Sequence, residues 1–138
     1  MTRDPMAACY AMFKTLFKSG YPFSYDLSDI ARYYGAYRRL MDHWQRTMPG
    51  AILALGYEEL VADQLAGTRK LLEYCGLEWE DACVAFHQNP APTMTASASQ
   101  VRRPIYTSSL KQWRHYEAQL AELKSRLALE GVAMTESS

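Results

Sequence analysis

Residues 27–48 read LSDIARYYGAYRRLMDHWQRTM, and this stretch says most about the fold. Its large apolar side chains advance by alternating steps of three and four residues, the spacing of one face of an α-helix. They are Leu27, Ile30, Tyr34, Tyr37, Met41, Trp44 and Met48. Ser24 and Asp26 are the candidate N-caps, and Pro49-Gly50 ends the helix. The stretch predicts a long amphipathic helix with a solvated charged face.

Helices are also predicted on both sides of this one. Asp4 followed by Pro5 is a typical helix start, and an apolar stripe continues from there to Gly20. Because a full helix begins so soon after Met1, with no preceding element to cover its stripe, we expect a truncated domain. Further along, helical patterns cover residues 63–75, 81–86 and 109–129.

Residues 51–56, AILALG, form a continuous apolar run of strand length. With a helix on each side, this run is typical of a buried parallel strand, and residues 57–60 then form a turn. A parallel strand needs neighbours that satisfy its backbone N–H and C=O groups. The sequence offers no clear neighbour, so we expect part of a sheet to lie outside the chain or in a partner.

The amino-acid composition limits the classes of function that are open to this chain. Apolar residues make up 49 % of the chain, charged residues 22 %, and the formal net charge is +0, which argues against a nucleic-acid or membrane-surface protein. No apolar run is long enough to span a bilayer. The three cysteines are interpreted as reduced core thiols of a soluble, cytoplasmic protein. His43, His87 and His115 lack metal-ligand spacing, so no metal site is assigned.

A long loop, residues 87–107, contains the string TASASQVRRPIY at 95–106. Loops of about 20 residues inside a compact domain are more often functional or disordered than simple connections. Hydroxyl and amide donors beside two arginines are the groups that bind phosphate. From composition alone, a phosphate site and an ordinary solvated loop both stay open.

Several short motifs occur in an order and spacing that resemble one family. They are RDP at 3–5, PFSYDL at 22–27, YEELV at 57–61, CGLEW at 75–79 and the string at 95–106, followed by Ser108, Ser109, Trp113 and Tyr116. Together they resemble the C-terminal part of bacterial sulfotransferases that use 3'-phosphoadenylyl sulfate (PAPS). These enzymes are often fused to tetratricopeptide repeats and are related to the tyrosylprotein sulfotransferases. The resemblance covers about residues 3 to 123.

The resemblance implies a fold class and an activity. The chain would be mostly α with one or two short parallel strands, as the C-terminal portion of a P-loop-kinase-like α/β sulfotransferase fold. Residues 1–130 would form a partial domain and residues 131–138 a flexible tail. The activity implied is PAPS-dependent transfer of a sulfuryl group to an acceptor hydroxyl or amine.

The resemblance also implies site residues. Arg3 would bind the 3'-phosphate of PAPS, and Tyr57 would lie beside the cofactor at the end of the strand. The segment closing over the nucleotide would contribute Ser97, Ser99, Gln100, Arg102 and Arg103. Relatives carry a serine where this chain has Ala11, so one bond to the 3'-phosphate is missing. Tyr25 or Tyr34 would lie on the acceptor side.

No glycine-rich phosphate loop is present in these residues, and no catalytic residue is assigned. We therefore expect no catalysis by this chain alone, and a partnership with an upstream sulfotransferase half or self-association through an uncovered sheet edge. The alternative is a non-catalytic helical interaction module derived from the same fold. A nucleic-acid or phosphopeptide binder using Arg102 and Arg103 is disfavoured by the neutral net charge.

Overall fold

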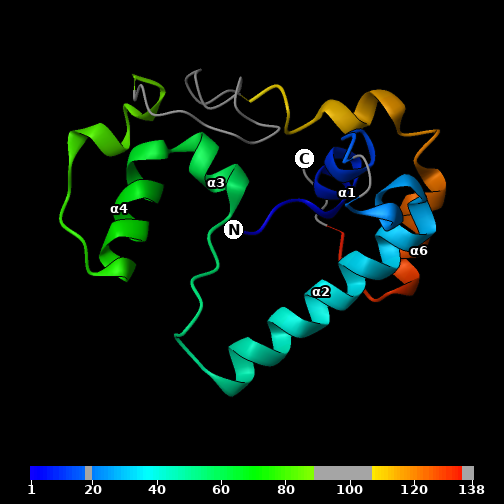
Figure 1. Cartoon of the computed structure of the whole chain (residues 1–138), viewed down its shortest axis with the longest axis horizontal. Coiled ribbons are helices and arrows are strands. Elements are labelled where there is room, and N and C mark those ends of the chain that lie inside the picture. Colours follow the sequence, from blue (N-terminus) through cyan, green and yellow to red (C-terminus); the bar gives the residue numbers. More distant parts are fainter. Residues whose placement is uncertain (18–19, 89–106, 135–138) are drawn as a thin grey trace. The chain divides into compact units, whose positions relative to one another are not determined.

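The computed structural model describes residues 1–17, 20–88 and 107–134. The chain divides into two compact units (Figure 1). Unit 1 comprises residues 1–2 and 53–107, and unit 2 comprises residues 3–52 and 108–138. The described residues are mostly helical, as expected from the sequence.

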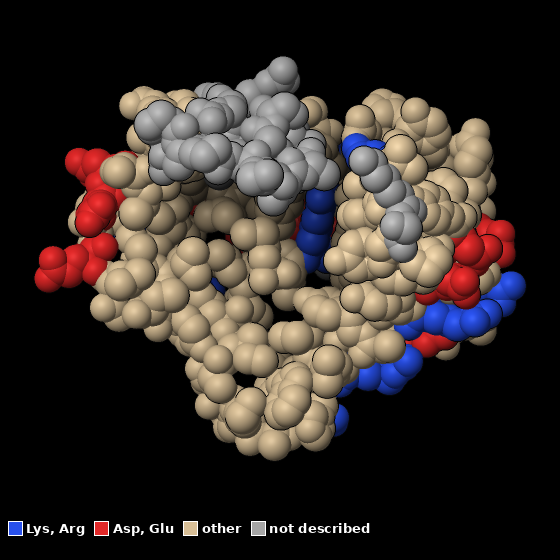
Figure 2. Space-filling view, in the orientation of Figure 1, with Lys and Arg blue, Asp and Glu red and all other residues tan. Residues whose placement is uncertain are grey.

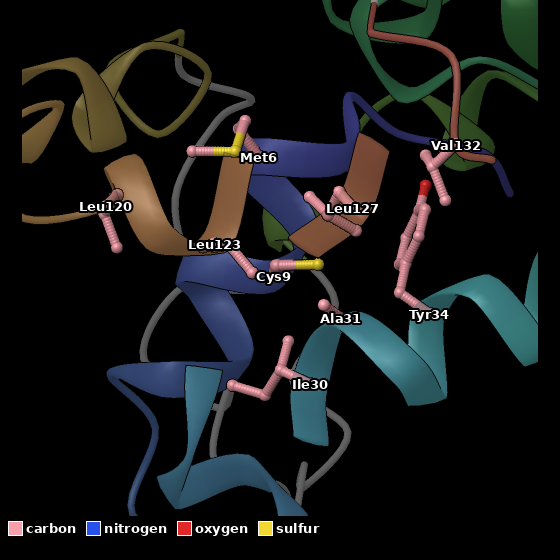
Figure 3. Close-up of a cluster of buried hydrophobic side chains, with 9 residues drawn as sticks. All are labelled: Met6, Cys9, Ile30, Ala31, Tyr34, Leu120, Leu123, Leu127 and Val132. Carbon is pink, nitrogen blue, oxygen red and sulfur yellow. The ribbon is translucent and has the colours of Figure 1, made fainter. Parts of the chain in front are cut away.

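Unit 2 is built on three α-helices that pack on one another. They are α1 (Pro5–Phe13), α2 (Leu27–Thr47) and α6 (Ala121–Leu129), with 3₁₀ helices η1 at Pro22–Tyr25 and η4 at Gln112–Tyr116. Figure 3 shows that all three α-helices send side chains into one apolar cluster. Its members are Met6, Cys9, Ile30, Ala31, Tyr34, Leu120, Leu123, Leu127 and Val132.

The predicted bounds of α2 are confirmed. The Asp26 carboxylate accepts hydrogen bonds from the backbone N–H groups of Ser28 and Asp29 at 2.8 and 2.9 Å, so Asp26 rather than Ser24 is the N-cap. The apolar stripe is buried only in its first half, where Ile30 and Tyr34 are 0 and 5 % exposed. Trp44 and Met48, further along, are exposed, because α1 and α6 lie beside the first half of α2 (Figure 1).

Two predicted helices of unit 2 are shorter than the sequence pattern. α1 ends at Phe13 rather than at Gly20. Just after this end, the Thr15 hydroxyl donates a hydrogen bond to the Ala11 carbonyl at 2.7 Å. The last helix begins at Ala121 rather than Ser109. Trp113 packs against the core and the ring of Tyr116 stacks on Tyr10, so tertiary contacts hold residues 112–116 in a 3₁₀ helix.

The end of α6 determines the structure of residues 131 and 132, the first two of the predicted flexible tail over residues 131–138. Gly131 has φ +75°, and the N–H of Val132 donates to the Leu127 carbonyl at 3.0 Å, which is a glycine-based helix end. This turn directs Val132 back into the core, where it is 7 % exposed. At least Val132 therefore belongs to the packed unit.

The described part of unit 1 contains two short α-helices, α3 (Tyr57–Ala62) and α4 (Gln64–Cys75), and 3₁₀ helices at Asp81–Cys83 and Phe86–Gln88. The prediction for α4 is confirmed at both ends, because the Asp63 carboxylate caps the Ala66 N–H at 2.9 Å and Gly76 is left-handed with φ +67°. α3 was predicted as a turn, and the helix over residues 81–86 is replaced by the two 3₁₀ turns.

The predicted strand over residues 51–56 is wrong for the described residues. Within them, the only strand-like pairing is one parallel bridge between Thr2 and Gly56. The Thr2 N–H donates to the Leu55 carbonyl and the Tyr57 N–H donates to the Thr2 carbonyl, both at 2.8 Å. A longer ladder would need a neighbouring backbone beside residues 53–55.

The cysteine prediction is only partly correct. All three cysteines are free thiols, but only Cys9 is buried, while Cys75 and Cys83 are exposed in unit 1. None of the helices in the described ranges is both long and apolar enough to cross a membrane.

Replacing Leu127 with alanine tests the core of unit 2. Leu127 is 0 % exposed, so the substitution leaves a cavity between α1, α2 and α6, and we expect a loss of about 2–5 kcal/mol in unfolding free energy. Leu129, on the same helix, is 79 % exposed, and Leu129→Ala is expected to cost less than about 0.5 kcal/mol. Chemical denaturation followed by helical circular dichroism measures both; equal losses would contradict this core.

Candidate functional site

Arg3 stands directly before the first turn of α1 and is tied to a distant part of unit 2. Its Nη2 donates a hydrogen bond to the backbone carbonyl of Ser109 at 2.9 Å, across 106 residues of sequence. The contact is partly buried. The guanidinium is therefore held in one position at the start of the helix.

The backbone of Arg3 is fixed as well. The Tyr34 hydroxyl, on α2, donates to the Arg3 carbonyl at 3.2 Å. Burial raises the pKa of Tyr34 to about 12, with the nearby Cys9 adding to the shift and Arg38 opposing it. Tyr34 thus stays protonated at neutral pH, and its O–H group donates the hydrogen bond to the Arg3 carbonyl. Tyr34 is only 5 % exposed, whereas Tyr25, the other tyrosine expected on the acceptor side, is exposed.

Asp4 occupies the N-terminus of α1. Its carboxylate accepts the Ala7 N–H at 2.8 Å, and Pro5 at the first helical position has no N–H to offer. The carboxylate also interacts favourably with the positive end of the helix dipole. An anion near Arg3 would therefore bind mainly through the guanidinium, because a side chain already satisfies part of the helix terminus.

Residues 109–116 are packed along α1. The ring of Tyr116 stacks on Tyr10 with centroids 5.5 Å apart, and Lys14 Nζ donates to the Gln112 side-chain oxygen at 2.5 Å. Together with the bond between Arg3 and Ser109, these contacts fix the segment against both ends of α1. The Ser109 Oγ is buried and has no hydrogen-bond partner within the described part of the chain.

The other predicted site residues are distributed as follows. Tyr57 is the first residue of α3, in unit 1, and its N–H is used in the bridge to Thr2. Arg3 belongs to unit 2. Ala11 is on α1, two turns beyond Arg3, and is half-buried. Five predicted residues lie outside the described residues, namely Ser97, Ser99, Gln100, Arg102 and Arg103.

Sequence reasoning missed Ser109 as the partner of Arg3. No local pattern could have revealed it, because the contact joins residues 106 positions apart. The available signal was positional. Ser109 follows closely after the Ser/Arg-rich string and precedes Trp113 and Tyr116, whose aromatic rings anchor the segment on the core and on α1.

The charged surface of unit 2 is mixed in sign. Arg39 pairs with Glu130 at 2.9 Å, Arg32 with Asp29 at 3.4 Å and Arg126 with Glu122 at 3.8 Å. Figure 2 shows blue and red side chains beside one another on this face. No His, Cys, Asp or Glu group suited to a metal ion occurs among the described residues. The basic group of interest is therefore the positioned Arg3, not a broad charged patch.

Comparison with known proteins gives two findings. A sequence model described as Sulfotransferase family matches residues 1–81, more than half of the chain. An uncharacterized protein of Aquifex aeolicus (strain VF5) is 40 % identical over 98 residues. That similarity covers 71 % of this chain but only 13 % of the relative's length.

Tyr34→Phe tests how the Arg3 backbone is held. We expect a loss of about 1 kcal/mol in unfolding free energy at pH 7, since the bond to the Arg3 carbonyl disappears. In the wild type, folding raises the pKa of Tyr34 from 10.0 to about 12, so this contribution is complete below pH 10 and is lost as pH rises toward 12.

Tyr34→Phe should therefore lose stability less steeply over that interval than the wild type. Tyr33→Phe is the matched control, because Tyr33 is the neighbouring residue and is 51 % exposed. Denaturation curves at a series of pH values measure the slopes; identical slopes for Tyr34→Phe and the wild type would contradict this assignment.

Proposed function

Because this chain belongs to the sulfotransferase family, we propose that it forms part of a PAPS-dependent sulfotransferase domain in which Arg3 binds the 3'-phosphate. The reaction served is transfer of the sulfuryl group of PAPS to an acceptor hydroxyl or amine. The observation that carries this proposal is the two-sided anchoring of Arg3, through its guanidinium to Ser109 and through its carbonyl to Tyr34.

The anchoring supports phosphate binding for two physical reasons. A guanidinium presents a planar fork of donors that matches the oxygens of a phosphate. An arginine already held in place loses less conformational freedom when the ligand arrives, so more of the interaction energy appears as affinity. The Asp4 carboxylate nearby acts in the opposite direction by repelling the anion.

The rest of the nucleotide site is proposed from the family resemblance. Tyr57 would lie beside the cofactor, and the late loop would close over it with Ser97, Ser99, Gln100, Arg102 and Arg103. Arg103 lies six residues before Ser109, and six extended residues span at most about 20 Å. This spacing allows the loop to reach the neighbourhood of Arg3. We also place the chain in the branch often fused to tetratricopeptide repeats.

We propose that these 138 residues do not transfer sulfate by themselves. Charge develops on the bridging oxygen as the sulfuryl group leaves, and a glycine-rich loop of backbone N–H groups is the usual stabiliser of such charge. The seven glycines here are scattered and form no such loop. An upstream sulfotransferase half would supply it, together with the base that activates the acceptor.

The bridge between Thr2 and Gly56 supports an upstream partner. Its two hydrogen bonds define a parallel register, in which residues before Thr2 would run beside residues 53–55. A strand in that position would provide the missing neighbour of the apolar run. Self-association through the same edge is the other partnership compatible with this register.

One observation favours the alternative of a non-catalytic interaction module. Leu40 and Trp44 on α2 and Met48 at its C-cap follow one another at four-residue steps and are 51, 37 and 43 % exposed. Such a stripe is typical of a helix that docks on another protein. Nucleotide binding separates the two functions, because an interaction module derived from this fold has no need of it.

Arg3→Ala is the direct test of the proposed function. We expect wild-type protein to bind 3'-phosphoadenosine 5'-phosphate in calorimetry, and Arg3→Ala to bind at least tenfold more weakly, since a charge-assisted hydrogen bond contributes about 1.5–3 kcal/mol. Arg32→Ala removes the same charge from the exposed face of α2 and should leave binding unchanged.

Ala11→Ser adds a gain-of-binding comparison in the same experiment. It restores the hydroxyl that relatives carry, and we expect it to tighten binding by about tenfold. No binding by the wild type at millimolar ligand would reject the proposed function and favour the interaction module.

A further inference from the structure

Ser109 has two features that no sequence motif indicated. Its backbone carbonyl accepts a hydrogen bond from the Arg3 guanidinium at 2.9 Å. Its hydroxyl oxygen is buried without a hydrogen-bond partner among the described residues. A buried hydroxyl that forms no hydrogen bond has lost its hydration without compensation, which is unfavourable. Unsatisfied groups of this kind in a folded protein need a physical explanation, such as a ligand that is bound only in the working state.

The two features lie close together for a covalent reason. Only four bonds separate the carbonyl oxygen of Ser109 from its hydroxyl oxygen, so the hydroxyl cannot be far from the bound guanidinium. The residue as a whole keeps some exposure to solvent. Rotation about the single side-chain torsion χ1 moves the hydroxyl between three staggered positions at low cost. An anion arriving at Arg3 can therefore be met by this donor.

We propose that Ser109 is a second ligand of the 3'-phosphate, with its carbonyl positioning Arg3 and its hydroxyl donating to a phosphate oxygen. The inference rests on the proposed function and deepens it by adding a binding residue. Ser109 would also supply a hydroxyl donor in place of the serine that relatives carry at the position of Ala11. The residue is in turn held by the packing of residues 112–116 on α1.

The Ser109→Ala variant is expected to weaken nucleotide binding without lowering the thermal stability of the protein. Removing an unsatisfied buried hydroxyl should leave the thermal midpoint of the ligand-free protein unchanged or raise it. The same change should weaken 3'-phosphoadenosine 5'-phosphate binding by about tenfold, because one hydrogen bond to a charged group is lost. A merely structural serine would lower stability and binding together.

The experiment is calorimetry and thermal unfolding on the full chain with matched variants. Ser108→Ala removes an exposed hydroxyl next in sequence and should change neither quantity. Ser109→Thr keeps the hydroxyl and should retain most of the affinity. Adenosine 5'-phosphate, which lacks the 3'-phosphate, should bind equally to the wild type and to Ser109→Ala.

The outcomes separate this inference from the proposed function. If the wild type binds the 3'-phosphorylated nucleotide and Ser109→Ala binds it equally well, the role of Ser109 is rejected while the proposed function stands. If Ser109→Ala loses stability together with affinity, or weakens both nucleotides equally, the inference is also overturned. Absence of nucleotide binding by the wild type rejects both.

Discussion

The hydrogen bond between the Arg3 guanidinium and the Ser109 carbonyl is the contact on which the proposed function of unit 2 depends. It joins the residue before the N-cap of α1 to the segment that leads into α6, and those two helices pack with α2 around one core. Tyr34 adds a second tie from α2 to the same arginine. A single residue is thereby coupled to all three helices, so the position of its guanidinium follows from the packing of the core.

Electrostatics at this helix start involves a compromise between stability and binding. The Asp4 carboxylate caps α1 and stabilises it, yet it places a negative charge beside the arginine that would bind an anion. Burial raises the pKa of Cys9 to about 12, with Asp4 as a secondary cause, so the thiol beneath the site stays neutral. The thiol therefore adds no second negative charge beside the arginine.

The sequence predicted what local signals determine. The helical stripe gave the bounds of α2, and Asp63 and Gly76 gave those of α4. It failed where distant contacts decide, as for residues 112–116, which a stacked Tyr116 and a partly buried Trp113 hold in a 3₁₀ helix. It predicted a strand at residues 51–56 from apolar character alone, but a strand forms only with a neighbour. Arg3 was found from a motif, whereas its partner Ser109 carries no local signal.

Nucleotide recognition by the positioned arginine is tested most directly by a crystal structure of the chain with 3'-phosphoadenosine 5'-phosphate. We predict that the 3'-phosphate lies within about 3 Å of the Arg3 guanidinium while Nη2 still contacts the Ser109 carbonyl, which is hydrogen-bond distance for a charged pair. A nucleotide bound elsewhere on the chain, with no phosphate oxygen near Arg3, would contradict the account.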